Sequence, residues 1–255
     1  WLSVFVDKKE EIIDPTDWPG NGTEAEPWQL RNAEDIQRLA ERVNSGTTYE
    51  GKFFKMTADI TLPKDYPGMG LAPGGNESKG ANLKPFSATF DGGNFTLTYE
   101  YGAETPLIRV AREATVKNLN INAPYIKNSA VLGEIYLDYG SDGDYSAGTG
   151  GSYQAGTPDT IDISNVTIKS GSNILKSGFI GEGEGSSGAN TINITNCKIE
   201  KGVNIGYDAD KQASAGLNSI GSFAGSISGT INNCWSAATV YGNNSVGGIV
   251  GNKSQ

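Results

Sequence analysis

Apolar residues recur at helical spacing in one stretch of the chain, residues 32–46. Four of them would form a single stripe along a helix, namely Ile36, Leu39, Ala40 and Val43. Asn32 is a suitable N-cap with Asp35 at the third helical position, and Gly46 is a suitable end. The pattern predicts one amphipathic helix over about Ala33–Asn44.

Strand-like patterns dominate the residues after this helix. Residues 51–62 and 86–101 are rich in Phe, Thr, Ile and Tyr and are bounded by Gly, Pro or Asn, which is typical of strands. Within the second segment, Asp91-Gly92-Gly93-Asn94 indicates a turn between two strands. Residues 63–85, between the two segments, have the composition of a long loop.

Residues 1–19 differ from the rest in composition. "WLSVFVD" alternates like a short strand, and a charged stretch with prolines follows it. We expect residues 1–19 to be a strand or linker from a preceding domain, and residues 20–255 to form one domain. Because the sequence starts with Trp1 and stops within a repeat, we also expect the natural polypeptide to be longer.

From residue 114 onward the strand pattern repeats. The four copies are "ATVKNLNINA" (114–123), "IDISNVTIKS" (161–170), "TINITNCKIE" (191–200) and "GTINNCWSAA" (229–238). Their shared asparagines, 47, 31 and 37 residues apart, are Asn118, Asn165, Asn196 and Asn233. Asn tolerates the left-handed conformation, and its amide can bond the amides above and below it, so we expect these residues to mark corners. The residues that should stack inward beside them are Leu119, Val166, Cys197 and Cys234.

A glycine-containing element follows each copy. The four elements are "SAVLGEI" (129–135), "SGFIGEG" (177–183), "IGSFAGS" (220–226) and "VGGIVGN" (246–252). We expect positive φ at their shared glycines, which are Gly133, Gly181, Gly225 and Gly251. Repeats of this length made of short strands indicate stacked coils that share one core. The sequence therefore predicts an all-β fold, a β-solenoid.

These motifs resemble the GLUG repeats of secreted and surface proteins, many of them from gut Bacteroidetes. "VGGIVG" (246–251) is the copy most similar to the family pattern, and residues 20–62 and 86–101 are similar to the lead-in of such proteins. "TPLIRVA" (105–111) occupies the place of a first repeat but lacks its glycines. The resemblance implies a right-handed parallel β-helix, with the helix at Ala33–Asn44 as its N-terminal cap. It brings no catalytic or binding residues.

Charge and composition exclude several classes of function. The formal net charge of -9 disfavours nucleic acid and anionic membranes as partners, and no window is apolar enough to span a membrane. The chain has no histidine, which excludes Ser-His-Asp and Cys-His catalysis and His-ligated zinc. An enzyme here would have to use carboxylates, Lys, Arg or Tyr.

Two glycine-rich segments suggest ligand sites. The closing "SVGGIVGNKSQ" (245–255) has the glycines, lysine and serine of a phosphate-binding loop, but Asn252 interrupts the Gly-Lys spacing and no helix follows. We therefore assign it to the repeat. Asp138, Asp142 and Asp144 could hold calcium, but their spacing does not match an EF-hand, and a solvated loop is the simpler interpretation.

Cysteines, acids and aromatic residues supply the remaining candidates. Cys197 and Cys234 occupy matching repeat positions, so either a disulfide or two buried thiols is compatible with the pattern, and we favour thiols. The acids available for a carboxylate pair are Asp162, Glu182, Glu184, Glu200, Asp208 and Asp210. The candidates for sugar stacking are Trp18, Trp28, Tyr49, Tyr125, Tyr136 and Tyr139, of which we expect Trp28 and Tyr49 to pack around the cap.

Two functions remain. The first is a non-catalytic module of a secreted or cell-surface protein, with an adhesion or spacer role, that binds a host or dietary glycan or a surface protein through its loops. The alternative is a carbohydrate-active β-helix enzyme, a lyase or glycoside hydrolase. A cluster of acids with Lys or Arg on one face of the solenoid, in an open groove, would favour the enzyme, and we expect none. We assign no catalytic, cofactor-binding or metal-binding residues.

Overall fold

The computed structural model describes residues 18–71, 84–135, 160–182, 191–227 and 229–252. This part of the chain is mostly β, with one helix and with strands that pair in parallel, except for one short antiparallel hairpin and one antiparallel bridge. The predicted all-β class with a single helix is confirmed. The "WLSVFVD" segment lies outside the described residues.

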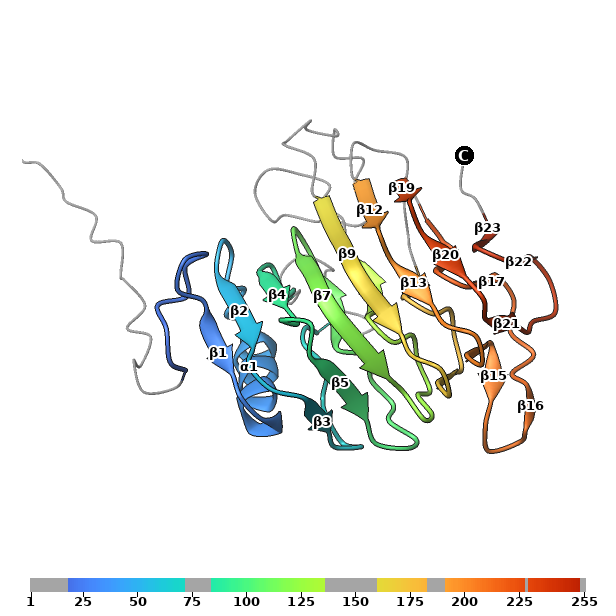
Figure 1. Ribbon diagram of the computed structural model, residues 1–255, viewed down its shortest axis with the longest axis horizontal. Coiled ribbons are helices and arrows are strands. Elements are labelled where there is room, and N and C mark those ends of the chain that lie inside the picture. The colour runs from blue at the N-terminus through green and yellow to red at the C-terminus, as the bar shows by residue number, and fades with distance from the viewer. Residues whose placement is uncertain (1–17, 72–83, 136–159, 183–190, 228, 253–255) are drawn as a thin grey trace, which may run out of the picture.

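The largest sheet has eleven strands. They are β1 (Trp28–Leu30), β2 (Phe53–Met56), β3 (Ile60–Leu62), β4 (Thr89–Asp91), β5 (Thr96–Tyr99), β7 (Thr115–Asn122), β9 (Thr160–Ile168), β12 (Thr191–Thr195), β13 (Lys198–Ile199), β19 (Gly229–Asn232) and β20 (Trp235–Ser236). Its order, β1-β2-β4-β7-β9-β12-β19, follows the sequence, so each pass of the chain adds a strand beside the previous one (Figure 1).

Two smaller parallel sheets run beside it. The first has the order β23-β18-β11-β8-β6 and consists of β6 (Ile108–Ala111), β8 (Leu132–Ile135), β11 (Ile180–Glu182), β18 (Ala224–Ser226) and β23 (Val250–Asn252). The second consists of β10 (Asn173–Ile174), β14 (Asn204–Ile205) and β21 (Thr239–Val240). Two separate pairs complete the strands: parallel β17 (Ile220–Gly221) with β22 (Val246–Gly247), and antiparallel β15 (Tyr207–Asp208) with β16 (Ala213–Ser214).

The sheet register follows the sequence repeat. Leu119 pairs with Val166, and Lys198 pairs with Thr167 on one side and with Trp235 on the other. These pairings reproduce the separations of the repeat asparagines. The prediction that "TPLIRVA" (105–111) occupies the place of a first glycine-containing element is also confirmed, because its Ile108 pairs with Leu132 of "SAVLGEI".

The repeat asparagines form the predicted corners. Their φ angles are 54°, 54°, 55° and 50°, at Asn118, Asn165, Asn196 and Asn233. The Asn165 side-chain amide donates to Oδ1 of Asn118 at 3.1 Å, and the Asn233 amide donates to Oδ1 of Asn196 at 2.6 Å. The ladder begins one pass earlier, where Asn118 donates to Oδ1 of Asp91 at 3.1 Å.

The turn at Asp91–Asn94 is also a corner. Asn94 has a φ of 66°, and the flanking strands β4 and β5 both pair with β7 rather than with each other. The predicted turn is therefore a bend between two strands that lie end to end in the same sheet.

The prediction of positive φ at the repeat glycines is wrong. Gly133, Gly181, Gly225 and Gly251 are absent from the residues with positive φ, and they lie in β8, β11, β18 and β23. They are glycines because a Cβ would be too close to the neighbouring backbone: 3.1 Å from Arg109 O at Gly133, and 2.5 Å from Ser219 O at Gly225. Close approach between adjacent segments, not a left-handed turn, explains these residues.

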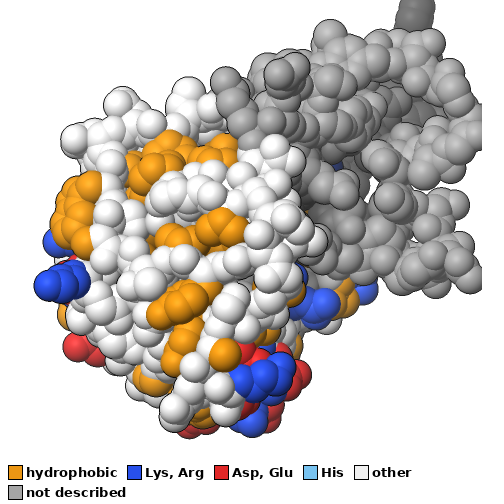
Figure 2. All heavy atoms as spheres, turned by 90° about the vertical axis from the view of Figure 1, so that its right-hand side faces the viewer, with side chains coloured by type: hydrophobic (Ala, Val, Ile, Leu, Met, Phe, Trp, Pro, Cys, Tyr) orange, Lys and Arg blue, Asp and Glu red, His pale blue; other side chains and the backbone are white. Residues whose placement is uncertain are grey.

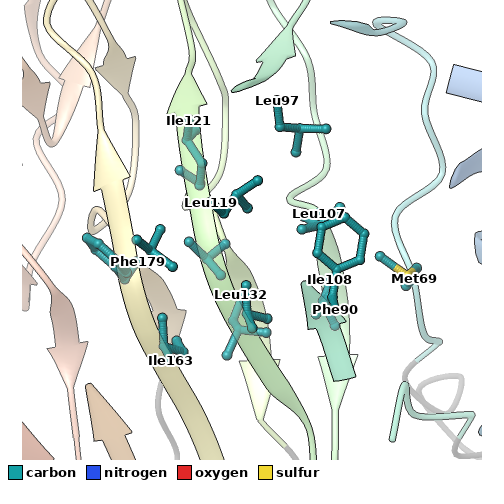
Figure 3. Close-up of a cluster of buried hydrophobic side chains, with 14 of the residues drawn as sticks. Met69, Phe90, Leu97, Leu107, Ile108, Leu119, Ile121, Leu132, Ile163 and Phe179 are labelled. Atoms are coloured by element: carbon teal, nitrogen blue, oxygen red, sulfur yellow. The ribbon is translucent and has the colours of Figure 1, made fainter. Parts of the chain in front are cut away.

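The core lies between the sheets. Side chains of the large sheet, such as Phe90 and Leu119, point toward side chains such as Ile108, Leu132 and Phe179 (Figure 3). All five are at most 1% exposed. The stacking also brings like residues together, since the rings of Phe179 and Phe223 stack with centroids 4.9 Å apart.

The helix α1 (Ala33–Ser45) matches the prediction and ends one residue later. Oδ1 of Asn32 accepts the backbone N–H of Asp35 at 2.9 Å, and Gly46 ends the helix with a φ of 117°. The helix contacts β1, the first strand of the large sheet, and its apolar stripe is buried. It lies at the N-terminal end of the molecule (Figure 1).

Candidate functional site

Two tyrosines, two aspartates and a lysine come together where the β15–β16 hairpin meets the rest of the molecule. We call these residues the Tyr101 cluster: Tyr101, Tyr125, Asp208, Asp210 and Lys211. Tyr101 follows β5, Tyr125 follows β7, and the other three belong to β15 and the turn after it. The contacts join residues 83 and 109 positions apart in the sequence.

Hydrogen bonds fix the geometry of the cluster. The Tyr125 hydroxyl donates to Oδ1 of Asp208 at 3.1 Å, and the Tyr101 hydroxyl donates to Oδ1 of Asp210 at 3.0 Å. Oδ1 of Asp208 also accepts the backbone N–H groups of Asp210 and Lys211, at 3.1 and 3.3 Å. Nζ of Lys211 lies 2.8 Å from Oδ2 of Asp208. The Asp208 carboxylate is therefore bonded through both of its oxygens.

These contacts hold the cluster in one protonation state. The hydrogen bond from Lys211, with that from Tyr125, lowers the pKa of Asp208 below its usual value, and Asp208 in turn raises the pKa of Lys211. Burial, followed by the bond to Asp208, raises the pKa of Tyr125, and the bond to Asp210 raises the pKa of Tyr101. Near neutral pH, Asp208 is ionised, Lys211 is protonated and both phenols are neutral.

The cluster has a buried layer and an exposed layer. Tyr125 and Asp208 are buried, whereas Tyr101 is 53% exposed and Asp210 and Lys211 are open to solvent. The rings of Tyr101 and Tyr125 are in tilted contact, with centroids 5.3 Å apart. A second ring pair, Tyr207 with Tyr241 at 5.1 Å, comes from β15 and the residue after β21. The exposed layer offers the flat apolar ring of Tyr101, which is bonded to the acceptor Asp210, and the cationic Lys211, which is paired with Asp208.

The predicted aromatic candidates are mostly buried. Trp18, Trp28 and Tyr49 pack with Phe54 in one cluster at the N-terminal end, with ring centroids 5.1–6.2 Å apart. The expectation that Trp28 and Tyr49 pack around the cap is confirmed, and Trp18 packs with them. Tyr136 and Tyr139 lie outside the described residues.

The candidate acids have separate partners, apart from Asp208 and Asp210. Asp162 accepts the side-chain amide of Asn193 at 2.9 Å. Glu200 accepts the backbone N–H of Ser170, which lowers the pKa of its carboxyl, and pairs with Lys169 at 3.4 Å. The side chain of Glu182 and the whole of Glu184 lie outside the described part of the chain.

The structure thus contains a feature that we did not expect from the sequence, two acids with a lysine on one face. Asp208 and Asp210 were candidates, but Tyr101 and Lys211 were missed. No sequence signal relates Tyr101 to Asp210, because the contact depends on where the hairpin folds back.

The two cysteines are free thiols, as we favoured. Cys197 is buried, and burial raises the pKa of its thiol to about 12. Its backbone N–H donates to Sγ of Cys234 at 3.3 Å, and Val166 donates to Sγ of Cys197 at 3.4 Å. The predicted inward stack at this repeat position is confirmed.

The glycine-rich segments give no ligand site in the described residues. Residues 246–252 contain β22 and β23, and Lys253 lies outside the described part, as do Asp138, Asp142 and Asp144. Across the described ranges, no three His, Cys, Asp or Glu side chains are placed to hold a metal ion. Nor do those ranges include a helix long and apolar enough to cross a membrane.

Comparison with known proteins gives a fold relationship. No protein-family profile and no curated protein sequence matches the chain. Among solved structures, the chain is similar to "a putative immunoglobulin A1 protease from Bacteroides ovatus", with a TM-score of 0.54 and 18% sequence identity. The likeness covers 92% of this chain and 64% of the other, so this chain spans less than two thirds of the length of the solved chain that it matches.

Proposed function

We propose that the chain is a non-catalytic module of a secreted or cell-surface bacterial protein, a right-handed parallel β-helix with GLUG-like repeats. It presents the Tyr101 cluster to a glycan and serves in adhesion or as a spacer. The observation that carries the proposal is the exposed Tyr101 ring, whose hydroxyl donates to Asp210 on a stacked scaffold.

Three findings support the β-helix. Successive strands pair in parallel at the separations of the repeat, the asparagines stack at corners, and one core lies between the sheets. The similarity to a Bacteroides structure adds support for the fold and for a bacterial setting. The protease name belongs to that protein and carries no activity to this chain.

The protonation state of Asp208 disfavours a role as general acid. Glycoside hydrolysis uses one carboxyl with a raised pKa as general acid and a second carboxylate as base or nucleophile. The pKa of Asp208 is lowered instead, so it stays ionised and has no proton to donate. The phenols of Tyr101 and Tyr125 hold their protons more tightly than usual. Such groups suit steady hydrogen bonding to sugar hydroxyls.

A glycan screen tests the proposal. Immobilised bacterial, host mucin and plant glycans are probed with the wild-type chain and with Tyr101→Ala. We expect at least one glycan to bind and Tyr101→Ala to weaken it by about tenfold or more, because the exposed ring supplies the stacking surface. Trp235→Ala is the matched control, since Trp235 is equally exposed (51%) but lies on β20. Binding that Tyr101→Ala leaves intact, or no binding at all, would contradict the proposed site.

A further inference from the structure

Cys197 and Cys234 lie side by side on two successive passes of the stack. Before them β12 pairs in parallel with β19, and after them β13 pairs in parallel with β20, so the two cysteines occupy the same position in neighbouring passes. Strands paired in this way lie about 4.8 Å apart. That separation is within the range of about 4.4–6.8 Å between the Cα atoms of a disulfide.

The two thiols have matching surroundings and contact each other's passes. Sγ of Cys197 donates to Thr195 O at 3.3 Å, and Sγ of Cys234 donates to Asn232 O at 3.2 Å. The backbone N–H of Cys197 donates to Sγ of Cys234 at 3.3 Å, and the two side chains also interact through a hydrogen bond. The sulfur of Cys234 therefore lies against the pass that carries Cys197.

We propose that this pair is a modification site, at which a low-molecular-weight disulfide oxidises the two thiols to a disulfide between neighbouring passes. In the first step, the Cys234 thiolate attacks one sulfur of the external disulfide, whose S–S bond breaks and releases one thiol. In the second step, Cys197 attacks Sγ of Cys234, and the second external thiol leaves. The two protein thiols are oxidised, the external disulfide is reduced to two thiols, and these receive the two protons through solvent.

Burial determines the order of the two steps. Cys197 is 1% exposed, and its raised pKa of about 12 leaves little thiolate near neutral pH, whereas Cys234 is half-buried. Residues 212–252 contain no Asp or Glu that would repel an anionic disulfide near Cys234. Figure 2 faces the end of the molecule that carries this segment and shows the charged side chains toward its rim. The second step is intramolecular, which offsets the low thiolate fraction of Cys197.

The bridge would close a loop that carries part of the Tyr101 cluster. The cysteines are 37 residues apart, and Asp208, Asp210 and Lys211 lie between them. Because a disulfide restricts the unfolded chain, oxidation should stabilise the pass from which the β15–β16 hairpin extends. The inference does not depend on glycan binding, since both oxidation and unfolding are measured without a glycan.

Oxidised glutathione, added to the reduced 255-residue chain under native conditions, tests the proposal. After an acid quench and alkylation in denaturant, we expect a monomer with no alkylated cysteine and no bound glutathione. Trypsin should then release residues 177–198 joined to residues 212–253, and dithiothreitol should separate the two peptides. The oxidised chain should unfold about 5 °C above the reduced chain.

Two variants serve as controls, each shown by circular dichroism to be folded. Cys197→Ala should retain one glutathione, because the thiol that completes the exchange is missing. The matched control combines Cys234→Ala with Trp235→Cys, which keeps two cysteines in the same passes but places one at a position that is 51% exposed. It should bind glutathione without forming a bridge.

A bridge that forms equally well in the matched control would overturn the proposal, because the position of Cys234 would then not matter. So would a wild-type chain that keeps both thiols, that stops at the glutathione adduct, or that forms links only to a second chain.

Discussion

At the scale of single residues, asparagine and glycine contribute to the stacking of the strands in two different ways. Asn165 holds a φ of 54° and donates to the asparagine of the pass before it. Gly225 has an ordinary φ but leaves no room for a Cβ beside Ser219. One residue type permits the corner, and the other permits close contact between segments. The two roles can be separated by substitution.

Asn165→Ala should lower the free energy of unfolding by about 1–3 kcal/mol. The variant loses the amide hydrogen bond and leaves a Cβ in the left-handed region. Asn165→Gly loses only the hydrogen bond, so a smaller decrease is expected in the same urea titration. Equal stability of both variants and the wild type would show that the ladder contributes nothing.

Gly225→Ala should be destabilising by about 1–3 kcal/mol, because the new Cβ would lie 2.5 Å from Ser219 O and the backbone has to shift. Gly248→Ala is the control in the same repeat pattern, because a methyl group added there would have no atom within 4 Å and the residue has no positive φ. Thermal unfolding of the two variants should differ clearly. A Gly225→Ala variant that unfolds with the control would refute the close-contact explanation.

At the scale of elements, α1 depends on one buried carboxylate. Asp35 is 1% exposed, accepts two hydrogen bonds from the Arg31 guanidinium and lies 3.4 Å from Arg38. Burial alone would raise the pKa of Asp35, but the hydrogen bonds and charge of Arg31 outweigh it and lower the pKa. The ion pairs therefore tie the start of the helix to the end of β1.

The stability that Asp35 contributes should be lost in acid. Its pKa is lower in the folded chain than the unfolded value of about 3.9, so the contribution is complete above that value and disappears as the pH falls through the folded pKa. Asp35→Asn should be less stable at pH 7 and lose less stability between about pH 5 and pH 2. Glu41→Gln, an exposed position on the same helix, should follow the wild type. Parallel curves for Asp35→Asn and wild type would contradict this account.

The elements were largely predictable because their signals are local or periodic. The apolar stripe and the caps of α1 lie within residues 32–46, and the asparagine spacing gives the sheet register from β7 onward. The glycine role was not predictable from the sequence, since a tight contact and a left-handed turn select the same residue. Composition alone assigns Trp18 to a separate N-terminal segment, whereas its ring packs with Trp28 and Tyr49.

At the scale of the whole molecule, stacking creates the site and the two unlike ends. The Tyr101 cluster joins residues 109 positions apart, and it exists because the β15–β16 hairpin folds back over earlier passes. Sequence patterns identified Tyr125, Asp208 and Asp210 as candidates but could not bring them together. The charged residues are distributed unevenly along the chain, since residues 212–252 contain no Asp, Glu, Lys or Arg.

The central claim is that this molecule binds a glycan without cleaving it. The most direct test incubates a glycan retained in the screen with the wild-type chain and follows its length by mass spectrometry. We expect the glycan to remain intact while it stays bound, and Asp208→Asn to change binding only. Shortened or unsaturated products that accumulate with the wild type and disappear with Asp208→Asn would contradict the claim and identify the chain as a carbohydrate-active enzyme.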